Sequence, residues 1–259
     1  MNGPLDPPLT GHCVVVTRPR NQSNQLREQL EQLGARVILF PTIKIVPAQD
    51  AFLLEAALAR IRQYDWILLT SRNAVNALVR TTKAGVGEAL SGVRIAVVGM
   101  ATHRHLADLG IQADFIPSRF NMATLCSELI EKVNVDGQRF LYPCGDLVDD
   151  EGPQALRDAG AVVDAIEAYR TTPDDSADAD SLRRSLAAEE IDAIVFASPS
   201  AVRAFFTTIA SRCVSPQVGL VSIGPKTTQA LERATPGRVT DARQAGVEGL
   251  VEALIRALG

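Results

Sequence analysis

The sequence has 259 residues, of which 46% are apolar and 22% charged, so it is long enough for one large or two medium globular domains. This composition excludes a disordered or fibrous chain. The longest apolar runs, such as residues 66–69, are far shorter than the roughly 20 residues of a membrane helix, so we expect no membrane segment. The net charge of −4 offers no basic surface for a nucleic acid partner.

The amino terminus and the cysteines bear on the cellular compartment. The opening residues, MNGPLDPPLTGH, have neither a cationic start nor an apolar core, so we interpret them as a flexible leader rather than an export signal. We therefore expect a cytoplasmic protein. The cysteines are widely separated and form no Cys-x-x-Cys pair, so we expect them to be reduced and structural; they are Cys13, Cys126, Cys144 and Cys213.

Short apolar runs alternate with amphipathic stretches along the whole chain. The first run, 14–17, precedes a stretch at 22–33 whose leucines recur at helical spacing and which ends before Gly34, a residue typical of helix carboxyl caps. Short, fully apolar strands that alternate with helices are typical of parallel sheets covered on both faces, so we predict an α/β fold. Further strands of this kind are expected at 66–69, 95–98, 140–142, 194–196 and 221–223.

The chain also repeats itself at an offset of about 126 residues. The segment LLTSRNAV at 68–75 aligns with VFASPSAV at 195–202, and VVGMATHRHLADLG at 97–110 aligns with SIGPKTTQALERAT at 222–235. A third pair, VVVTRP and FLYPCG, ends the first strand of each half. A duplication of about half the chain predicts two similar α/β domains.

Two extended segments, 37–47 and 162–173, correspond under the same offset, and each is closed by a proline. If they pair antiparallel as a two-stranded connector, residues from about 49 to 161 form one domain, and the first strand and helix join the carboxyl-terminal half. The alternative is two consecutive halves with a boundary near residue 136. Periodicity alone does not choose between these arrangements.

The repeated motifs fall where open parallel sheets bind ligands, beyond the carboxyl ends of the strands and beside helix amino termini. These positions offer side-chain hydroxyls and unpaired backbone amides. The plain alternative for each residue is helix capping, but recurrence in both halves favours a binding role. The candidates are Ser71, Asn73, Gly99 and Thr102 in one half and Ser198, Gly224 and Thr227 in the other.

Two more residues complete the candidate set. Arg18 follows the first predicted strand, where a cation can meet an acidic ligand; the plain alternative is a solvated surface charge. Tyr169 lies in the extended segment 162–173, where alternating faces put it on the side of Glu167 and opposite Ile166. Either its ring packs on a neighbour, or its hydroxyl faces an interdomain cleft.

Other chemistries lack their motifs. His103 and His105 are two residues apart on a predicted helix and point to different sides, which disfavours a metal site. The sequence has no Walker phosphate loop, no Gly-x-Gly-x-x-Gly fingerprint and no Gly-x-Ser-x-Gly elbow. Nucleotide-binding, nicotinamide-dependent and serine-hydrolase functions therefore lack support.

Taken together, the motifs resemble those of the uroporphyrinogen-III synthases. The resemblance covers nearly the whole chain from residue 13 and depends on the order and spacing of VVVTRP, LLTSRNAV, VVGMATHRHLADLG, LYPCG, AIEAYRT, VFASPSAV, SIGPKTTQAL and GVEGLVEAL. The chain departs from the family within LYPCG, where an arginine commonly precedes the glycine and this sequence has Cys144. That departure puts an anion contact from this position in doubt.

The resemblance implies a fold of two parallel-sheet, flavodoxin-like domains joined by a two-stranded antiparallel connector. The first domain is then discontinuous and comprises residues 1–40 and 172–259. Residues 49–161 form the second domain. The connector strands are expected at 41–48 and 162–171.

The resemblance also implies a reaction. Enzymes of this family cyclise the linear tetrapyrrole hydroxymethylbilane in an interdomain cleft, with loss of water and inversion of ring D through a spirocyclic intermediate. No metal or organic cofactor is implied. We expect a monomer whose partners are this small substrate and, transiently, the preceding enzyme of tetrapyrrole and heme biosynthesis, hydroxymethylbilane synthase.

The family's functional residues are carried over by position. Tyr169 matches the connector tyrosine and is expected to assist departure of the hydroxyl. Thr102 and Thr227 match threonines that line the cleft, and Arg18 is expected to be a supplementary clamp. The acetate and propionate groups of the substrate would be held by Ser71, Asn73, Ser198 and the backbone around Gly99 and Gly224.

Two other functions remain open at this point. The first is a non-enzymatic two-domain module that closes on an acidic metabolite or tetrapyrrole, in which the polar Tyr169 has no special reason to exist. The second is a sugar-phosphate enzyme that uses helix amino termini, which would need a sharper glycine-rich loop than any in this sequence.

Overall fold

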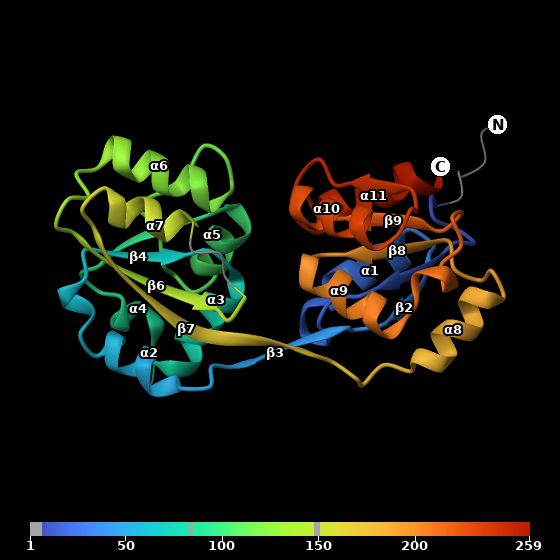
Figure 1. The fold of residues 1–259 in the computed structure, drawn as a ribbon, viewed down its shortest axis with the longest axis horizontal. Coiled ribbons are helices and arrows are strands. Elements are labelled where there is room, and N and C mark those ends of the chain that lie inside the picture. The colour runs from blue at the N-terminus through green and yellow to red at the C-terminus, as the bar shows by residue number, and fades with distance from the viewer. Residues whose placement is uncertain (1–6, 83–84, 148–150) are drawn as a thin grey trace. The chain divides into compact units, whose positions relative to one another are not determined.

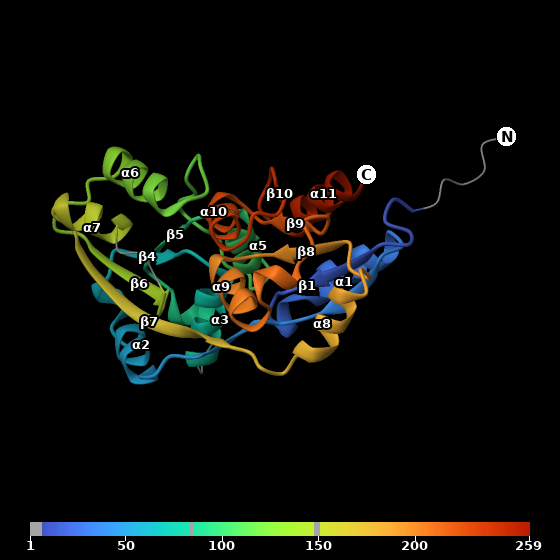
Figure 2. The same cartoon turned by 45° about the vertical axis from the view of Figure 1, so that its right-hand side comes forward.

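The computed structural model describes residues 7–82, 85–147 and 151–259, which form two compact units. Unit 1 contains the chain up to Lys44 and from Thr172 onward, and unit 2 contains Ile45–Thr171. Figures 1 and 2 show each unit as a central sheet with helices packed against it. Within the described ranges no helix is long and apolar enough to cross a bilayer.

The sheet of unit 1 has five strands in the order β10-β9-β8-β1-β2, and every neighbouring pair is parallel. Counted along the chain within this unit, the order from the other edge is 2-1-3-4-5, that of the flavodoxin-like fold. The strands are β1 (Cys13–Val16), β2 (Arg36–Leu39), β8 (Ala193–Phe196), β9 (Gly219–Ser222) and β10 (Val239–Asp241).

Helices cover both faces of this sheet, because successive side chains of each strand point to opposite sides. Val14 and Val16 of β1 pack with the helices of one face, and Cys13 and Val15 pack with those of the other. The first face carries α1 (Asn24–Gln32) and α11 (Val247–Leu258). The second carries α8 (Ala179–Ala187), α9 (Pro199–Thr208) and α10 (Pro225–Ala234). Short 3-10 turns lie at Arg20–Gln22 and Ser211–Cys213.

The sheet of unit 2 has the order β3-β7-β6-β4-β5, in which β7, β6, β4 and β5 are parallel. Its strands are β3 (Ile43–Pro47), β4 (Trp66–Leu69), β5 (Arg94–Val97), β6 (Arg139–Gly145) and β7 (Val162–Pro173). Ile67 and Leu69 face one helical layer, and Trp66 and Leu68 face the other.

One face of this sheet is covered by α2 (Ala51–Leu58), α3 (Arg72–Thr81), α4 (Val86–Ala89) and α5 (Met100–Ala107). The other is covered by α6 (Met122–Lys132) and α7 (Glu151–Asp158), which Figure 1 shows side by side. A 3-10 turn at Ile61–Gln63 precedes β4.

The predicted repeat is visible in the sheet orders. The run β7-β6-β4-β5 in unit 2 corresponds to β2-β1-β8-β9 in unit 1, and both runs are parallel. The place of β10 in unit 2 is taken by a single parallel bridge between Ala96 and Phe115. The two units therefore share one arrangement of four parallel strands, but the order in which these strands follow one another along the chain differs between the units.

The two sheets divide the extended segment 37–47 between them. β2 pairs with β1 in unit 1, whereas β3 pairs with β7 in unit 2. Pro41, which has no amide hydrogen to donate to a ladder, lies between the two strands.

β3 and the end of β7 run side by side in opposite directions (Figure 1). Asp174 N donates to Thr42 O at 3.0 Å, and Gln49 N donates to Glu167 Oε1 at 3.0 Å. The two segments therefore run antiparallel to each other.

A buried carboxylate fixes the loop that precedes α6. Glu128 accepts hydrogen bonds from Ser118 N at 3.0 Å, from Ser118 Oγ, and from Lys132 Nζ at 2.7 Å. The Lys132 hydrogen bond, followed by those from Ser118, lowers the pKa of Glu128 from 4.5 to about 2. Its folded-state pKa lies below the unfolded value, so the charged form contributes stability above about pH 4.5 that is lost as the pH falls towards 2.

We expect Glu128→Gln to destabilise the protein at pH 6 and to cost less as the pH is lowered to 3. Below about pH 4.5 the carboxyl group of the unfolded wild type takes up a proton, so the advantage of the charged folded form shrinks. Urea unfolding followed by circular dichroism measures the difference at each pH. Glu131→Gln, an exposed position of the same helix, is the control. A wild-type-to-Glu128→Gln difference that stays constant from pH 6 to pH 3 contradicts this account.

Candidate active site

Parallel pairing gathers the predicted residues at the carboxyl edge of each sheet. In unit 2, Ser71 follows β4 and Gly99 follows β5, while Tyr169 of β7 lies opposite Gly145 at the end of β6. In a sheet of this order ligands bind where the chain reverses direction across the sheet, between the strands equivalent to β6 and β4. The corresponding edge of unit 1 carries Arg18, Ser198, Gly224 and Thr227, which follow β1, β8 and β9.

Tyr169 and Ser71 are in direct contact. The Tyr169 Oη and Ser71 Oγ atoms are 3.1 Å apart, and either hydroxyl can be the donor. Ser71 is also the N-cap of α3, where its Oγ accepts from Ala74 N at 3.1 Å. The capping interpretation is thus correct for Ser71, and the same hydroxyl still reaches the tyrosine.

A bulge in β7 sets the direction of the Tyr169 ring. Cys144 lies opposite Glu167, but the next residue, Gly145, lies opposite Tyr169, so β7 contains one extra residue. Tyr169 consequently packs against the same apolar cluster as Ala168. The prediction from strict alternation, which puts Tyr169 on the side of Glu167, is wrong for this reason.

Gly145 provides the room that the ring occupies. A Cβ atom at this position would be 2.8 Å from Tyr169 Cε2, closer than real Cβ contacts. Position 145 therefore requires glycine because an aromatic ring approaches its backbone closely, and not because of a special backbone angle.

The Tyr169 hydroxyl is protonated at neutral pH, because a phenol titrates near 10 even in water. Burial raises the pKa of Tyr169 above 10, the Ser71 hydrogen bond partly opposes this shift, and the nearby Cys144 and Asp146 add to it. At neutral pH the phenol is a hydrogen-bond donor that can face an oxygen of a ligand.

Gly99, Thr102 and Asn73 lie at the same edge of unit 2. Gly99 is the N-cap of α5 in extended conformation, and a Cβ there would be 3.3 Å from Cβ of Phe120. Thr102 is buried, and its amide donates to Gly99 O at 3.1 Å. Asn73 is half-buried in the first turn of α3.

In unit 1 the equivalent positions behave similarly. Ser198 caps α9 by accepting from Ala201 N at 3.1 Å. Gly224 begins α10 with open space where a Cβ would stand, and Thr227 is buried in the first turn of that helix. Arg18 is only 5% exposed, so its interpretation as a solvated surface charge is wrong.

Sequence reasoning did not single out Tyr142, a buried residue of β6. Burial raises the pKa of Tyr142 above its usual range, and the Thr70 side chain partly opposes this shift. Tyr142 lies within the motif LYPCG and Thr70 within LLTSRNAV, so the motifs themselves could have pointed to both residues. Cys144 in the same strand is buried with its Sγ 3.5 Å from Ile166 O, which directs this side chain into the sheet rather than towards a ligand.

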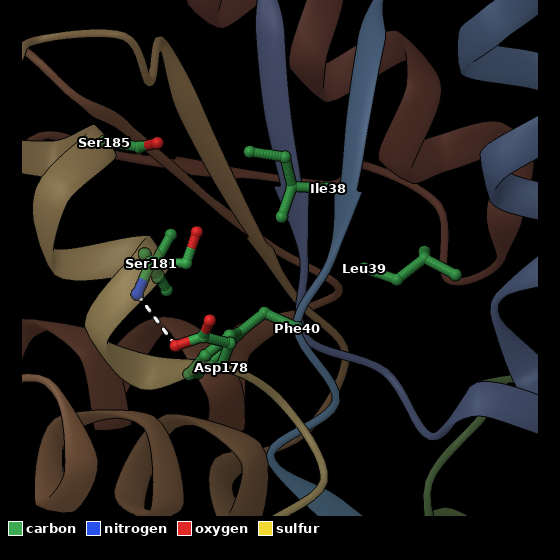
Figure 3. Close-up of a pocket in the computed structure, with 7 residues that line it drawn as sticks. Ile38, Leu39, Phe40, Asp178, Ser181 and Ser185 are labelled. Carbon is green, nitrogen blue, oxygen red and sulfur yellow. Dashed lines mark hydrogen bonds between the residues drawn. The ribbon is translucent and has the colours of Figure 1, made fainter.

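A pocket of about 130 Å³ lies elsewhere in unit 1, between β2 and α8. Figure 3 shows the apolar side chains of Ile38 and Phe40 on one side and the Ser181 and Ser185 hydroxyls on the other. The Asp178 carboxylate caps α8 through Ser181 N at 2.9 Å. None of the nine predicted site residues lines this pocket.

The described parts of the chain contain no cluster of three or more potential metal-ligating side chains, and all four cysteines are free thiols.

Comparison with protein families gives a match over most of the chain. A family model described as uroporphyrinogen-III synthase HemD matches residues 24–252. The uroporphyrinogen-III synthase of Synechococcus elongatus is 35% identical over 263 residues, which cover 95% of this chain and 96% of that protein. The enzyme of the same name from Chlorobaculum parvum is 27% identical, with 85% and 88% of the two chains covered.

Solved structures of the same name share the fold. Uroporphyrinogen III synthase from Thermus thermophilus, crystallised as a mutant, superposes with a TM-score of 0.65 at 18% identity, covering 95% of this chain and 98% of that one. The Helicobacter pylori enzyme gives a TM-score of 0.62 at 14% identity, with 95% and 99% covered. These likenesses confirm the predicted two-domain α/β fold, and the family match confirms the resemblance found in the motifs. The chain belongs to the uroporphyrinogen-III synthase family.

Proposed function

We propose that this chain converts hydroxymethylbilane into uroporphyrinogen III, closing the ring with loss of water and inversion of ring D. The observation that carries the proposal is the protonated Tyr169 hydroxyl, held by Ser71 at the carboxyl edge of a flavodoxin-like sheet. One water leaves and nothing is oxidised or reduced, so the balance of the reaction calls for no redox partner.

The enzyme's task is largely one of steering. Hydroxymethylbilane closes unaided to the symmetric isomer I, so the protein must hold a flexible chain in the geometry that leads to isomer III. Holding reacting groups in the correct orientation lowers the barrier without a strong acid or base. Modest chemistry from one phenol is therefore sufficient.

Tyr169 is the residue we assign to departure of the hydroxyl. Its O–H donates a hydrogen bond to the substrate hydroxyl as the C–O bond breaks, and the proton lost on ring closure completes the water that leaves. Assistance of this kind contributes up to roughly 10²–10⁴ in rate. The Ser71 hydroxyl fixes the direction of the phenol O–H and acts as a positioning residue.

Helix amino termini bind the carboxylates of the substrate. The backbone N–H groups that open α3, α5, α9 and α10 have no partner within their own helices and carry partial positive charge. Asn73, Thr102, Ser198 and Thr227 lie in or beside these turns, and Gly99 and Gly224 leave the backbone accessible. A net charge of −4 is compatible with such local attraction.

The proposal includes binding of one substrate molecule in a cleft by residues of both units, with Arg18 of unit 1 as a supplementary cation. It also retains a cytoplasmic monomer and a transient contact with hydroxymethylbilane synthase. These finer elements derive from the family resemblance.

We expect Tyr169→Phe to lower kcat for isomer III by roughly 10- to 100-fold, because it removes one hydrogen bond made to the departing hydroxyl. The matched control is Tyr64→Phe, which removes a hydroxyl bonded to Asp164 at 2.8 Å near the amino edge of the sheet. This control should lose stability and keep its turnover. Porphyrin isomers I and III are separated chromatographically after oxidation, and wild-type turnover in Tyr169→Phe would remove the role of this phenol.

Ser71→Ala tests the positioning role. The variant loses an N-cap, which costs about 1 kcal/mol of folding stability, and it also loses the Tyr169 contact, so we expect kcat to fall about three- to tenfold. Asp178→Ala removes the N-cap of α8 and leaves the predicted site intact. Urea unfolding and steady-state kinetics should show similar stability losses in the two variants but a drop in kcat only for Ser71→Ala. Equal kcat values would contradict the assignment.

A further inference from the structure

Large apolar side chains are exposed at the carboxyl edge of the unit 2 sheet. Phe120 is 54% exposed and Leu147 is 59% exposed, and Met100, the first residue of α5, is also exposed. Burial of such side chains is favourable, so their exposure around a polar site calls for an explanation.

Phe120 lies beside the predicted site. Its Cβ is 3.3 Å from the position that a Cβ of Gly99 would take. Gly99 follows β5, the neighbour of β4, whose end leads to Ser71. Phe120 therefore lies at the β5 end of the carboxyl edge, one strand along from the turn that carries Ser71.

The loop that carries Phe120 is fixed on both sides. Ser118 is bonded through its amide and hydroxyl to Glu128 of α6. Asn121 caps α6 by accepting from Thr124 N at 2.8 Å, and its own amide donates to Arg119 O at 2.9 Å. The backbone that carries the exposed ring is thus fixed before any ligand arrives, and such preorganisation reduces the entropy lost on binding.

Leu147 occupies the other side of the site. It comes two residues after Gly145, the glycine against which the Tyr169 ring lies. Asp146 secures this turn, since its amide donates to Tyr169 O at 3.2 Å and its carboxylate accepts from Thr171 N at 2.9 Å. In the order β6-β4-β5, Leu147 therefore follows β6 and Ser71 follows β4, whereas Phe120 comes after Phe115, which bridges to Ala96 of β5.

We propose that Phe120 and Leu147, with Met100 beside Phe120, form apolar walls that contact the pyrrole rings of the substrate. This inference rests on the proposed function and names residues that set substrate affinity. A tetrapyrrole chain is amphipathic, with flat apolar rings that bear carboxylate arms. Hydroxyls and helix amides between the walls bind the arms, and the walls bind the rings, where an aromatic side chain can pack on a pyrrole face or edge.

The test compares matched leucines. Leu109 is 39% exposed and follows α5, which begins at the carboxyl edge and runs back towards the opposite edge of the sheet. We expect Leu147→Ala and Phe120→Ala each to raise KM for hydroxymethylbilane about five- to tenfold, because part of an apolar contact is lost. Since such contacts hold substrate and transition state alike, kcat should stay within about twofold.

Two further variants sharpen the outcome. Leu109→Ala should have the wild-type KM, and Phe120→Leu, which keeps an apolar wall, should recover most of the loss seen in Phe120→Ala. If Phe120→Ala does not fold, the Leu147→Ala and Leu109→Ala pair decides. Wild-type KM values in Leu147→Ala and Phe120→Ala would overturn the proposal, as would an equal rise in KM for Leu109→Ala.

Failure of the proposed function gives a different result. A wild-type protein that yields only isomer I at the rate of the protein-free control overturns the synthase proposal itself, and the apolar walls with it. A wild type that makes isomer III, with unchanged KM in the wall variants, overturns only the walls.

Discussion

Parallel pairing of β4, β5, β6 and β7 is the constraint on which the candidate site depends. Strands that run in one direction must end at one edge, so residues far apart in the chain, such as Ser71 and Tyr169, come within 3.1 Å of each other. The same pairing places helix amino termini at that edge, and the partial positive charge of such termini favours anions. The Tyr169–Ser71 pair and the helix amino termini beside it thus arise from parallel pairing, which both sheets share.

The bulge in β7, which interrupts the regular pairing with β6, is as important for the site as the parallel pairing itself. One extra residue in β7 turns Tyr169 over Gly145, and the absence of a side chain at Gly145 makes room for the ring. The Tyr169 phenol, whose pKa burial raises further above the ordinary value of 10, is protonated at neutral pH. A polar centre flanked by fixed apolar side chains suits a substrate that combines flat rings with carboxylates.

Much of this could be predicted from the sequence, because the relevant signals are local. The apolar runs that became β4, β5, β8 and β9 lie within a few residues of their predicted positions, and the serines that end the repeated motifs cap α3 and α9. Non-local features were out of reach. The bulge at Tyr169 depends on the register with β6, and the burial of Arg18 depends on tertiary packing.

The proposed function of this chain is to direct the outcome of a ring closure that also proceeds without an enzyme. Its most direct test is the ratio of isomers that the purified protein forms from enzymatically generated hydroxymethylbilane, measured after oxidation against a protein-free control. The account predicts isomer III as the dominant product, formed faster than isomer I appears in the control. Isomer I alone, at the control rate, would contradict it.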